Sequence, residues 1–226
     1  MRTKLLVTAL AALCMPVVAS ADVAWSNSSG SAESFSWANG RNSDSNLFGS
    51  PTWFGGNTLY FTNSNFPAAA SDSRSSDTVT DVLDVDLTAG ENQKFLSIEI
   101  FEYGNYAITG GASNTVSAEL NMTGTVAGHG MSPFTDGFLF SASGDSAGTV
   151  PWNSSAELLL QFAVPDVSHL HLSVSNTLVA VSDGAGGTAE ITGNFVSLGI
   201  SATLIPEPSC LSLLAFGALA VLRRRR

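Results

Sequence analysis

Apolar and polar positions alternate with a period of two over long stretches between residues 22 and 205. In residues 169–181, leucine or valine at positions 170, 172 and 174 alternates with histidine or serine at positions 169, 171, 173 and 175. This period is typical of β-strands with one buried and one solvated face. The pattern, together with enrichment in β-branched residues, predicts strands at Asn57–Thr62, Val79–Leu87, Phe95–Tyr103, Thr115–Thr123, Glu157–Val164, His169–Val181 and Thr188–Leu204.

The segments between these strands are rich in glycine, asparagine, aspartate, serine and proline, which favour turns. No stretch of residues 22–205 keeps a helical period for three turns. Short strands separated by turns indicate an all-β fold, a single β-sandwich of jelly-roll or Greek-key type. We expect Asn63–Asp77 to be a long exposed loop, and Ala127–Asn153 to be a second polar interruption with an apolar island at residues 138–140.

The first 21 residues have the pattern of a secretory signal peptide. Positive charges at Arg2 and Lys4 precede an apolar stretch, and Ala19 and Ala21 form an A-x-A cleavage site. This pattern predicts export through the secretion translocon and a mature chain that begins at Asp22. A lipoprotein anchor at Cys14 is disfavoured, because the residue before it is leucine where a small residue is expected.

Residues 206–226 combine three unlike elements. In order they are the triplet Pro206, Glu207 and Pro208, the apolar run Ser209–Leu222, and the basic cluster Arg223, Arg224, Arg225 and Arg226. The prolines prevent regular secondary structure from continuing into the tail. The apolar run can enter lipid as a short helix of about 21 Å, which is shorter than the hydrocarbon core of about 30 Å. The arginines oppose translocation, so we expect them to remain cytoplasmic while residues 22–205 lie outside.

This tail resembles the PEP-CTERM sorting signal of envelope-forming bacteria. That family has the same parts in the same order, and Pro206, Glu207 and Pro208 match its box residue for residue. The resemblance covers about a tenth of the chain. It implies recognition and processing by an exosortase, an integral-membrane enzyme, and a link to exopolysaccharide or biofilm production. The apolar run is short for a permanent anchor and suits a transient signal better.

The segment between the two ends, residues 22–205, is strongly acidic. It holds eighteen acidic residues against three basic ones, Arg41, Arg74 and Lys94, for a net charge of −15. Such a charge repels nucleic acid, anionic lipid and acidic polysaccharide, although divalent cations could bridge the gap. Both cysteines, Cys14 and Cys210, lie in the end segments, so this part has no disulfide, zinc–thiolate site or cysteine nucleophile.

Two groups of side chains could bind a metal ion. Asp81, Asp84 and Asp86 form an acidic cluster whose last two members share a strand face, and its oxygen-rich chemistry favours calcium. The spacing is not that of an EF-hand. His169 and His171 also share a strand face, but a metal site there needs a third ligand. Exposed strand histidines without a metal are the simpler interpretation.

The sequence gives only weak evidence for catalytic residues. Ser146 lies in a G-x-S-x-G pattern, but Thr149-Val150-Pro151 cannot begin the helix that a nucleophile elbow requires, so a surface turn explains the pattern. Glycoside hydrolysis needs two carboxyl groups about 5–9.5 Å apart across a cleft. The acidic candidates for that role are Glu99, Glu102, Glu119 and Glu157. The tryptophans, which could stack on sugars but more often close a core, are Trp25, Trp37, Trp53 and Trp152.

The sequence therefore predicts a non-enzymatic protein that is exported and held transiently in the inner membrane, with residues 22–205 on the periplasmic side. It then becomes part of the cell envelope, surface or extracellular matrix, with exopolysaccharide as a partner. No cofactor is expected unless calcium binds the aspartates. The main alternative is a secreted carbohydrate-binding module that uses tryptophans and calcium, and a polysaccharide hydrolase is a more distant one.

Overall fold

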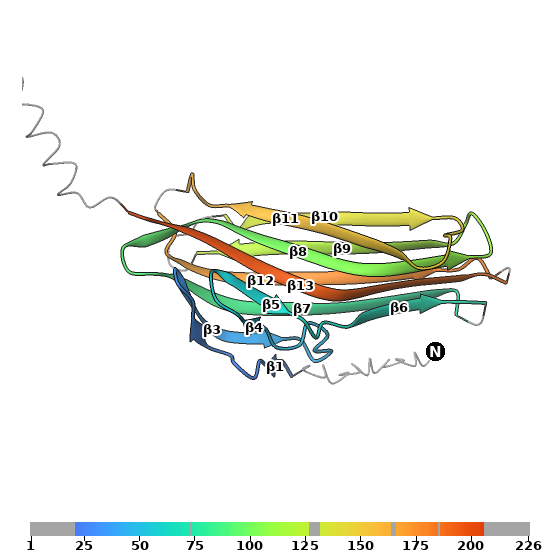
Figure 1. The fold of residues 1–226 in the computed structure, drawn as a ribbon, viewed down its shortest axis with the longest axis horizontal. Helices are drawn as coiled ribbons and strands as arrows, with labels where there is room; N and C mark the ends of the chain where they lie inside the picture. Colours follow the sequence, from blue (N-terminus) through green and yellow to red (C-terminus); the bar gives the residue numbers. More distant parts are fainter. Residues whose placement is uncertain (1–20, 73, 127–131, 164–165, 185, 206–226) are drawn as a thin grey trace, which may run out of the picture.

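The strands assemble into two antiparallel sheets that pack against each other, consistent with a β-sandwich (Figure 1). The computed structural model describes residues 21–72, 74–126, 132–163, 166–184 and 186–205, and no residue in these ranges is helical. The predicted signal peptide and the C-terminal helix, apart from Ala21, lie outside the described residues.

Sheet A has seven strands. Its order is β1-β3-β7-β12-β9-β10, and β2 pairs with β3. The bounds are β1 Val23–Ala24, β2 Gly30–Ser31, β3 Phe35–Asn42, β7 Ser76–Ala89, β9 Thr115–Thr125, β10 Phe134–Ser143 and β12 His169–Val181.

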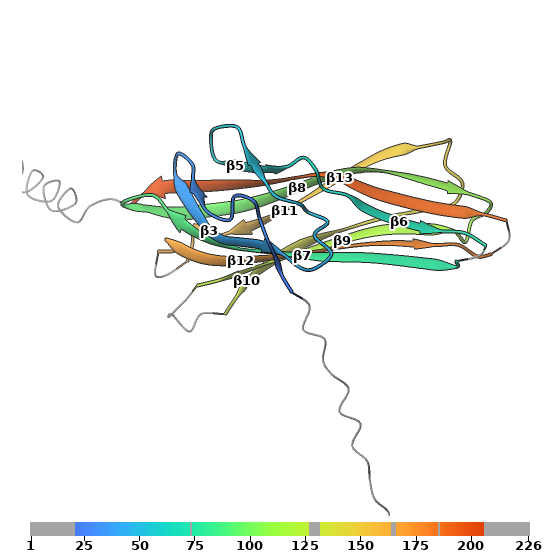
Figure 2. The same cartoon turned by 90° about the horizontal axis from the view of Figure 1, so that it is seen from below.

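Sheet B has six strands. Its order is β11-β8-β13-β5-β4, and β6 also pairs with β13. The bounds are β4 Thr52–Trp53, β5 Thr58–Phe61, β6 Phe66–Ala70, β8 Gln93–Thr109, β11 Val150–Leu159 and β13 Thr188–Leu204. Figure 2 shows the two layers edge on, with β8 and β13 in one layer and β7 and β12 in the other.

The core lies between the sheets and follows the period of two. On β12, Leu170, Leu172 and Val174 are buried, whereas His169 and His171 are exposed, as predicted. The period of two is interrupted at one point on β8. A register shift between β13 residues Ser201 and Ala202 interrupts it, so Phe95 is buried and Leu96 is not.

Two polar segments contain strands that the sequence did not predict. The exposed loop predicted at Asn63–Asp77 is wrong, because Phe66, Ala68 and Ala70 on β6 point into the core and Asp77 is buried. The interruption predicted at Ala127–Asn153 contains β10, whose Phe138 and Phe140 pack against the core. Serine, alanine and glycine dilute the apolar signal in both segments. The first strands, β1 to β4, were also missed.

Side-chain and backbone contacts close the sandwich where the edge strands β10 and β11 meet. Phe140 stacks on Trp152 with ring centroids 5.1 Å apart, and the backbone N–H of Glu157 donates to Asp136 at 2.7 Å. These contacts cover strand edges that would otherwise expose unpaired backbone groups.

Candidate functional site

Polar side chains gather on the outer face of sheet A, where β3, β7 and β12 lie side by side. We call Asn39, Arg41, Asp84, Asp86 and His171 the Asp86 cluster. The strand register brings them together, because Arg41 lies opposite Asp84 and His171 lies opposite Asp86. A bulge between Ala38 and Arg41, with Asn39 at a φ of 55°, turns the Asn39 side chain toward Asp86.

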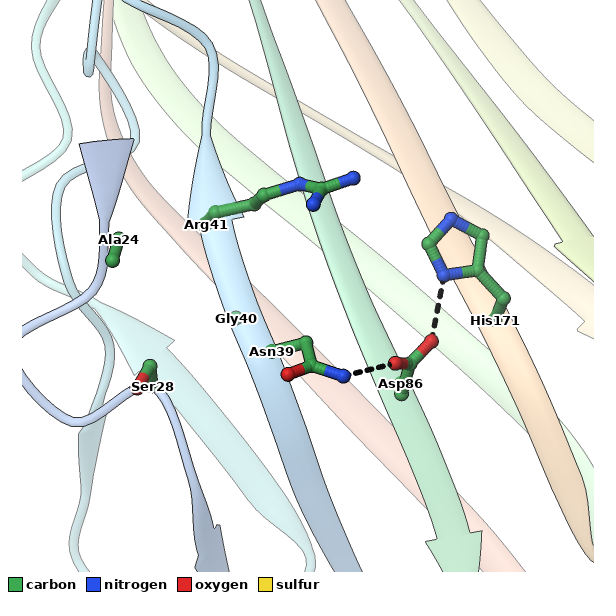
Figure 3. Close-up of a pocket in the computed structure, with 7 residues that line it drawn as sticks. All are labelled: Ala24, Ser28, Asn39, Gly40, Arg41, Asp86 and His171. Carbon is green, nitrogen blue, oxygen red and sulfur yellow. Dashed lines mark hydrogen bonds and ion pairs between the residues drawn. The ribbon is translucent and has the colours of Figure 1, made fainter. Parts of the chain in front are cut away.

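Both oxygens of the Asp86 carboxylate are engaged. Asn39 Nδ2 donates to Oδ2 at 2.7 Å, and His171 Nδ1 lies 2.7 Å from Oδ1 (Figure 3). The hydrogen bonds from Asn39 and His171 lower the pKa of Asp86 from its ordinary value. The Asp86 carboxylate is therefore stabilised in its ionised form.

Arg41 and His171 also bind neighbouring carboxylates. Arg41 Nε lies 3.0 Å from Asp22 and 3.6 Å from Asp84, and His171 Nε2 lies 3.7 Å from Asp84. The Arg41 side chain extends across β7 toward β12 (Figure 3). The Asp86 cluster is thus a surface charge network whose acidic groups already have partners.

A shallow hollow of about 310 Å³ lies beside this cluster. Its lining residues are Ala24, Ser28, Asn39, Gly40, Arg41, Asp86 and His171 (Figure 3). Gly40 is needed there, since a Cβ at this position would lie 2.1 Å from the Trp25 indole. A small polar ligand could enter the hollow, but a cation would have to displace the donors that hold Asp86.

The three aspartates of the predicted calcium cluster do not lie together. Asp84 and Asp86 point outward, whereas Asp81 is fully buried on the opposite face of β7. Asp81 accepts hydrogen bonds from the backbone N–H groups of Leu47 at 2.5 Å and Phe48 at 3.0 Å. It therefore fixes a loop to the strand. Within the described part of the chain, no group of three or more His, Cys, Asp or Glu side chains is arranged to hold a metal ion.

The two histidines share the outer face of β12, as the period of two predicts. His171 joins the Asp86 cluster, while His169 Nδ1 lies 3.1 Å from Thr88 Oγ1. The two rings therefore have different partners in the structure.

Ser146 is part of a turn. Its hydroxyl accepts from the Ile108 N–H at 2.9 Å and donates to the Gly148 carbonyl at 2.7 Å. Gly144 and Gly148 both have a positive φ. These contacts give the serine a structural role, as the surface-turn interpretation expects. His129, the histidine nearest upstream of Ser146 in the sequence, lies outside the described residues.

The four candidate glutamates are dispersed. Glu102 is fully buried between the sheets, and Glu119 is on β9 of sheet A. Glu99 and Glu157 lie directly opposite each other on the outer face of sheet B. This places two carboxylates side by side on one sheet, which differs from a pair facing each other across a cleft.

Three of the four tryptophans close the core, as the commoner interpretation predicts. Trp25, Trp37 and Trp152 are buried, and their indole N–H groups donate to Asn42, Asn27 and Thr192 respectively. Trp53 is 41% exposed beside β5.

Sequence reasoning missed Asn39 and Arg41, because it did not predict β3. One signal was present, since Arg41 is one of only three basic residues in the segment 22–205. Reasoning from tryptophan alone also missed the phenylalanines and tyrosines that line the outer face of sheet B.

The predicted sorting and cleavage residues are not placed by the structure, except for Ala21, which is exposed. Those outside the described residues are Ala19, Pro206, Glu207, Pro208, Arg223, Arg224, Arg225 and Arg226. Across the described ranges, no helix has the length and apolar character to cross a membrane.

Comparisons with known proteins give little. No protein-family model matches the chain, and no curated protein matches it. Among solved structures, the chain is similar to the carbohydrate-binding module TmCBM61 in complex with β-1,4-galactotriose. The identity is 9%, the match covers 58% of this chain and 86% of that one, and the TM-score is 0.21. A likeness this weak carries no argument for fold or function.

Proposed function

We propose that the protein is an exported, non-enzymatic component of the bacterial cell envelope or extracellular matrix. The observation that carries this proposal is the order of parts in the sequence: a signal-like N-terminus, an acidic cysteine-free β-rich segment, and a tail that resembles a PEP-CTERM signal. A processing enzyme of the exosortase type reads Pro206, Glu207 and Pro208, while the four terminal arginines set the orientation of the chain.

Support for a structural role comes from the placement of the reactive side chains. Ser146 holds a turn, Asp81 fixes a loop and Glu102 lies in the core. Each of these groups makes a hydrogen bond to a neighbouring part of the fold. In this proposal, residues 22–205 present a stable surface outside the cytoplasm.

The sandwich has a jelly-roll winding in our interpretation. Three strand pairs are nested in the sequence: β9 with β10, β8 with β11, and β7 with β12. Successive pairs alternate between sheets A and B. Such nesting arises when a long antiparallel pair of strands folds back and forth between the two sheets. This supports a jelly roll over a simple meander.

The export claim is tested by the mass of the mature protein in its native host. We expect cleavage after Ala21 and loss of the tail. Replacing the four terminal arginines with glutamine should leave export intact but abolish retention and tail processing, because the barrier to arginine translocation is lost. Four lysines at the same positions are the matched control and should preserve both. Unchanged maturation of the glutamine variant would contradict the sorting role.

A carbohydrate-binding module remains the second candidate. The specific observation in its favour is a group of aromatic side chains on the outer face of sheet B, among them Phe54, Tyr60 and Tyr103.

A further inference from the structure

Five aromatic side chains lie on the outer side of sheet B. We call Phe54, Tyr60, Phe101, Tyr103 and Phe195 the aromatic face. Tyr60 lies between the buried Leu59 and Phe61, so its ring points away from the core. Phe101 and Tyr103 flank the buried Glu102 in the same way.

Three of the rings contact one another across the strands. The ring centroid of Tyr60 lies 5.7 Å from that of Phe54 and 6.2 Å from that of Phe195. Tyr103 is directly opposite Phe195 in the β8–β13 register. Because neighbouring strands are about 4.8 Å apart, the row from Phe54 to Tyr103 extends about 15 Å across the strands.

These side chains are accessible. Phe54 is 73% exposed and Tyr103 is 39% exposed, and the other three are half-buried. Exposed aromatic side chains grouped on one face mark an interaction site more often than scattered single residues do.

A polar trough adjoins the aromatic face. It has a volume of about 210 Å³ and forms over Gly199, which has no side chain and lies between Thr58 and Glu99 in the register. Hydroxyl groups of Ser97 and Ser201 also line it. The surface therefore offers flat apolar rings beside uncharged hydroxyls and one carboxylate.

This combination matches the chemistry of a sugar chain. Pyranose rings present C–H groups on their faces, which pack on aromatic rings, and hydroxyls at their edges, which bond to polar side chains. We propose that the aromatic face and the trough over Gly199 bind a neutral polysaccharide. The inference deepens the proposed matrix role and rests on it.

The negative charge of this face favours binding of a neutral polysaccharide over an acidic one. Glu99 and Glu157 lie together on this face. The three basic side chains of the described residues are all engaged in ion pairs: Arg41 with Asp22 and Asp84, Arg74 with Asp77, and Lys94 with Asp166. An acidic polysaccharide would be repelled, and a second copy of a segment with a charge of −15 would be repelled as well.

Affinity electrophoresis of the full chain in detergent tests the proposal. The gels contain hydroxyethyl cellulose, laminarin or galactomannan as neutral probes and polygalacturonate as the acidic probe. We expect retardation by at least one neutral polymer and none by polygalacturonate. No retardation by any neutral polymer, or retardation by polygalacturonate alone, would overturn the proposal.

Matched variants locate the site. Tyr60→Ala and Phe54→Ala should each weaken binding by about tenfold or less, the range expected for loss of one aromatic contact. Leu139→Ala is the control, since Leu139 is 71% exposed on β10 of sheet A. If all three variants bind alike, the site is not the aromatic face.

Gly199→Val gives a test that does not remove a packing contact. A Cβ at Gly199 would lie 3.9 Å from its nearest neighbours, so valine should fit the strand and fill the trough. We expect lost binding with a melting temperature that is unchanged or higher. Retained binding by Gly199→Val would contradict the trough as a subsite. If sedimentation shows that the unchanged protein is a dimer and that Tyr60→Ala is a monomer, the aromatic face serves self-association instead. Since the protein is purified, these outcomes do not depend on export.

Discussion

At the scale of single residues, Glu102 and Asn176 form a polar pair inside the core that joins the two sheets. Asn176 Nδ2 on β12 donates to Glu102 Oε1 on β8 at 2.8 Å, and both residues are fully buried. Glu102 Oε2 and Asn176 Oδ1 are buried and have no hydrogen-bond partner in the structure. Protonation of Oε2 would supply a donor for Asn176 Oδ1, so a neutral acid can pair with the amide at both positions.

This pair predicts a pH-dependent stability. Burial raises the pKa of Glu102 to about 8, while the Asn176 hydrogen bond opposes the rise. In the unfolded chain the acid titrates near its ordinary value of 4.5, so the folded state binds more protons between these values. The Glu102 contribution to stability is full below about pH 4.5 and is lost as the pH rises to about 8, at about 1.4 kcal/mol per unit.

Urea denaturation from pH 5 to pH 9 measures this dependence. Glu102→Gln should remove it, because glutamine keeps the shape and hydrogen bonds of the neutral acid. Glu99→Gln, on the outer face of the same strand, is the control and should retain the slope. Equal slopes for Glu102→Gln and the unchanged protein would show that Glu102 is ionised in the fold.

Gly40 illustrates a second constraint at a single position. Its missing side chain makes room for the Trp25 indole, whereas a Cβ at Gly199 would make only ordinary contacts at 3.9 Å. We expect Gly40→Ala to lower the free energy of unfolding by about 1–3 kcal/mol through overpacking. Gly199→Ala should be neutral or stabilising by up to about 1 kcal/mol. Thermal unfolding of the two variants separates these effects, and equal shifts would contradict the close packing at Gly40.

At the scale of elements, buried side chains fix loops to strands. The Asp81 carboxylate on β7 accepts hydrogen bonds from the loop that follows β3. The donors are the backbone N–H groups of Leu47 and Phe48 and the hydroxyls of Ser43 and Ser45. The loop thereby covers that part of the core with Phe48.

Loss of this carboxylate should be costly. Asp81→Ala leaves the buried N–H of Phe48 and the part-buried N–H of Leu47 without an acceptor, and we expect a loss of about 2–5 kcal/mol in the free energy of unfolding. Asp84→Asn on the outer face of β7 should change stability by less than about 1 kcal/mol. Chemical denaturation gives both values, and a small effect at Asp81 would mean that water replaces the carboxylate.

The same elements show what the sequence can predict. His169–Val181 and Thr188–Leu204 are long strands whose buried and exposed residues alternate, and their predicted bounds agree with β12 and β13. β6 was missed because alanine and proline give little apolar signal, although Phe66 and Ala68 are buried. Asp81 and Asp86 look alike in a sequence, yet the pleat sends one into the core and the other to the surface.

Candidate sites were harder to predict than strands for a physical reason. The Asp86 cluster depends on the pairing of β3 with β7 and of β7 with β12, and these strands are far apart in the chain. Register across non-consecutive strands cannot be obtained from local patterns. The aromatic face arises in the same way from β5, β13 and β8.

At the scale of the whole molecule, the two outer faces of the sandwich have different chemistry. Sheet A presents the Asp86 cluster of paired charges, whereas sheet B presents aromatic rings and hydroxyls beside the carboxylates of Glu99 and Glu157. This asymmetry fits a protein that contacts a neutral polymer with one side. The net charge of −15 on residues 22–205 favours solvation and repulsion between copies of the protein.

The central claim is that the acidic sandwich resides outside the cytoplasm, and cysteine labelling in intact cells tests it most directly. Residues 22–205 contain no cysteine, so Leu139→Cys in a Cys210→Ser background places one thiol at an exposed position of the mature chain. We predict that a membrane-impermeant maleimide modifies this thiol in intact cells as fully as in lysed cells. Modification only after lysis would contradict the account.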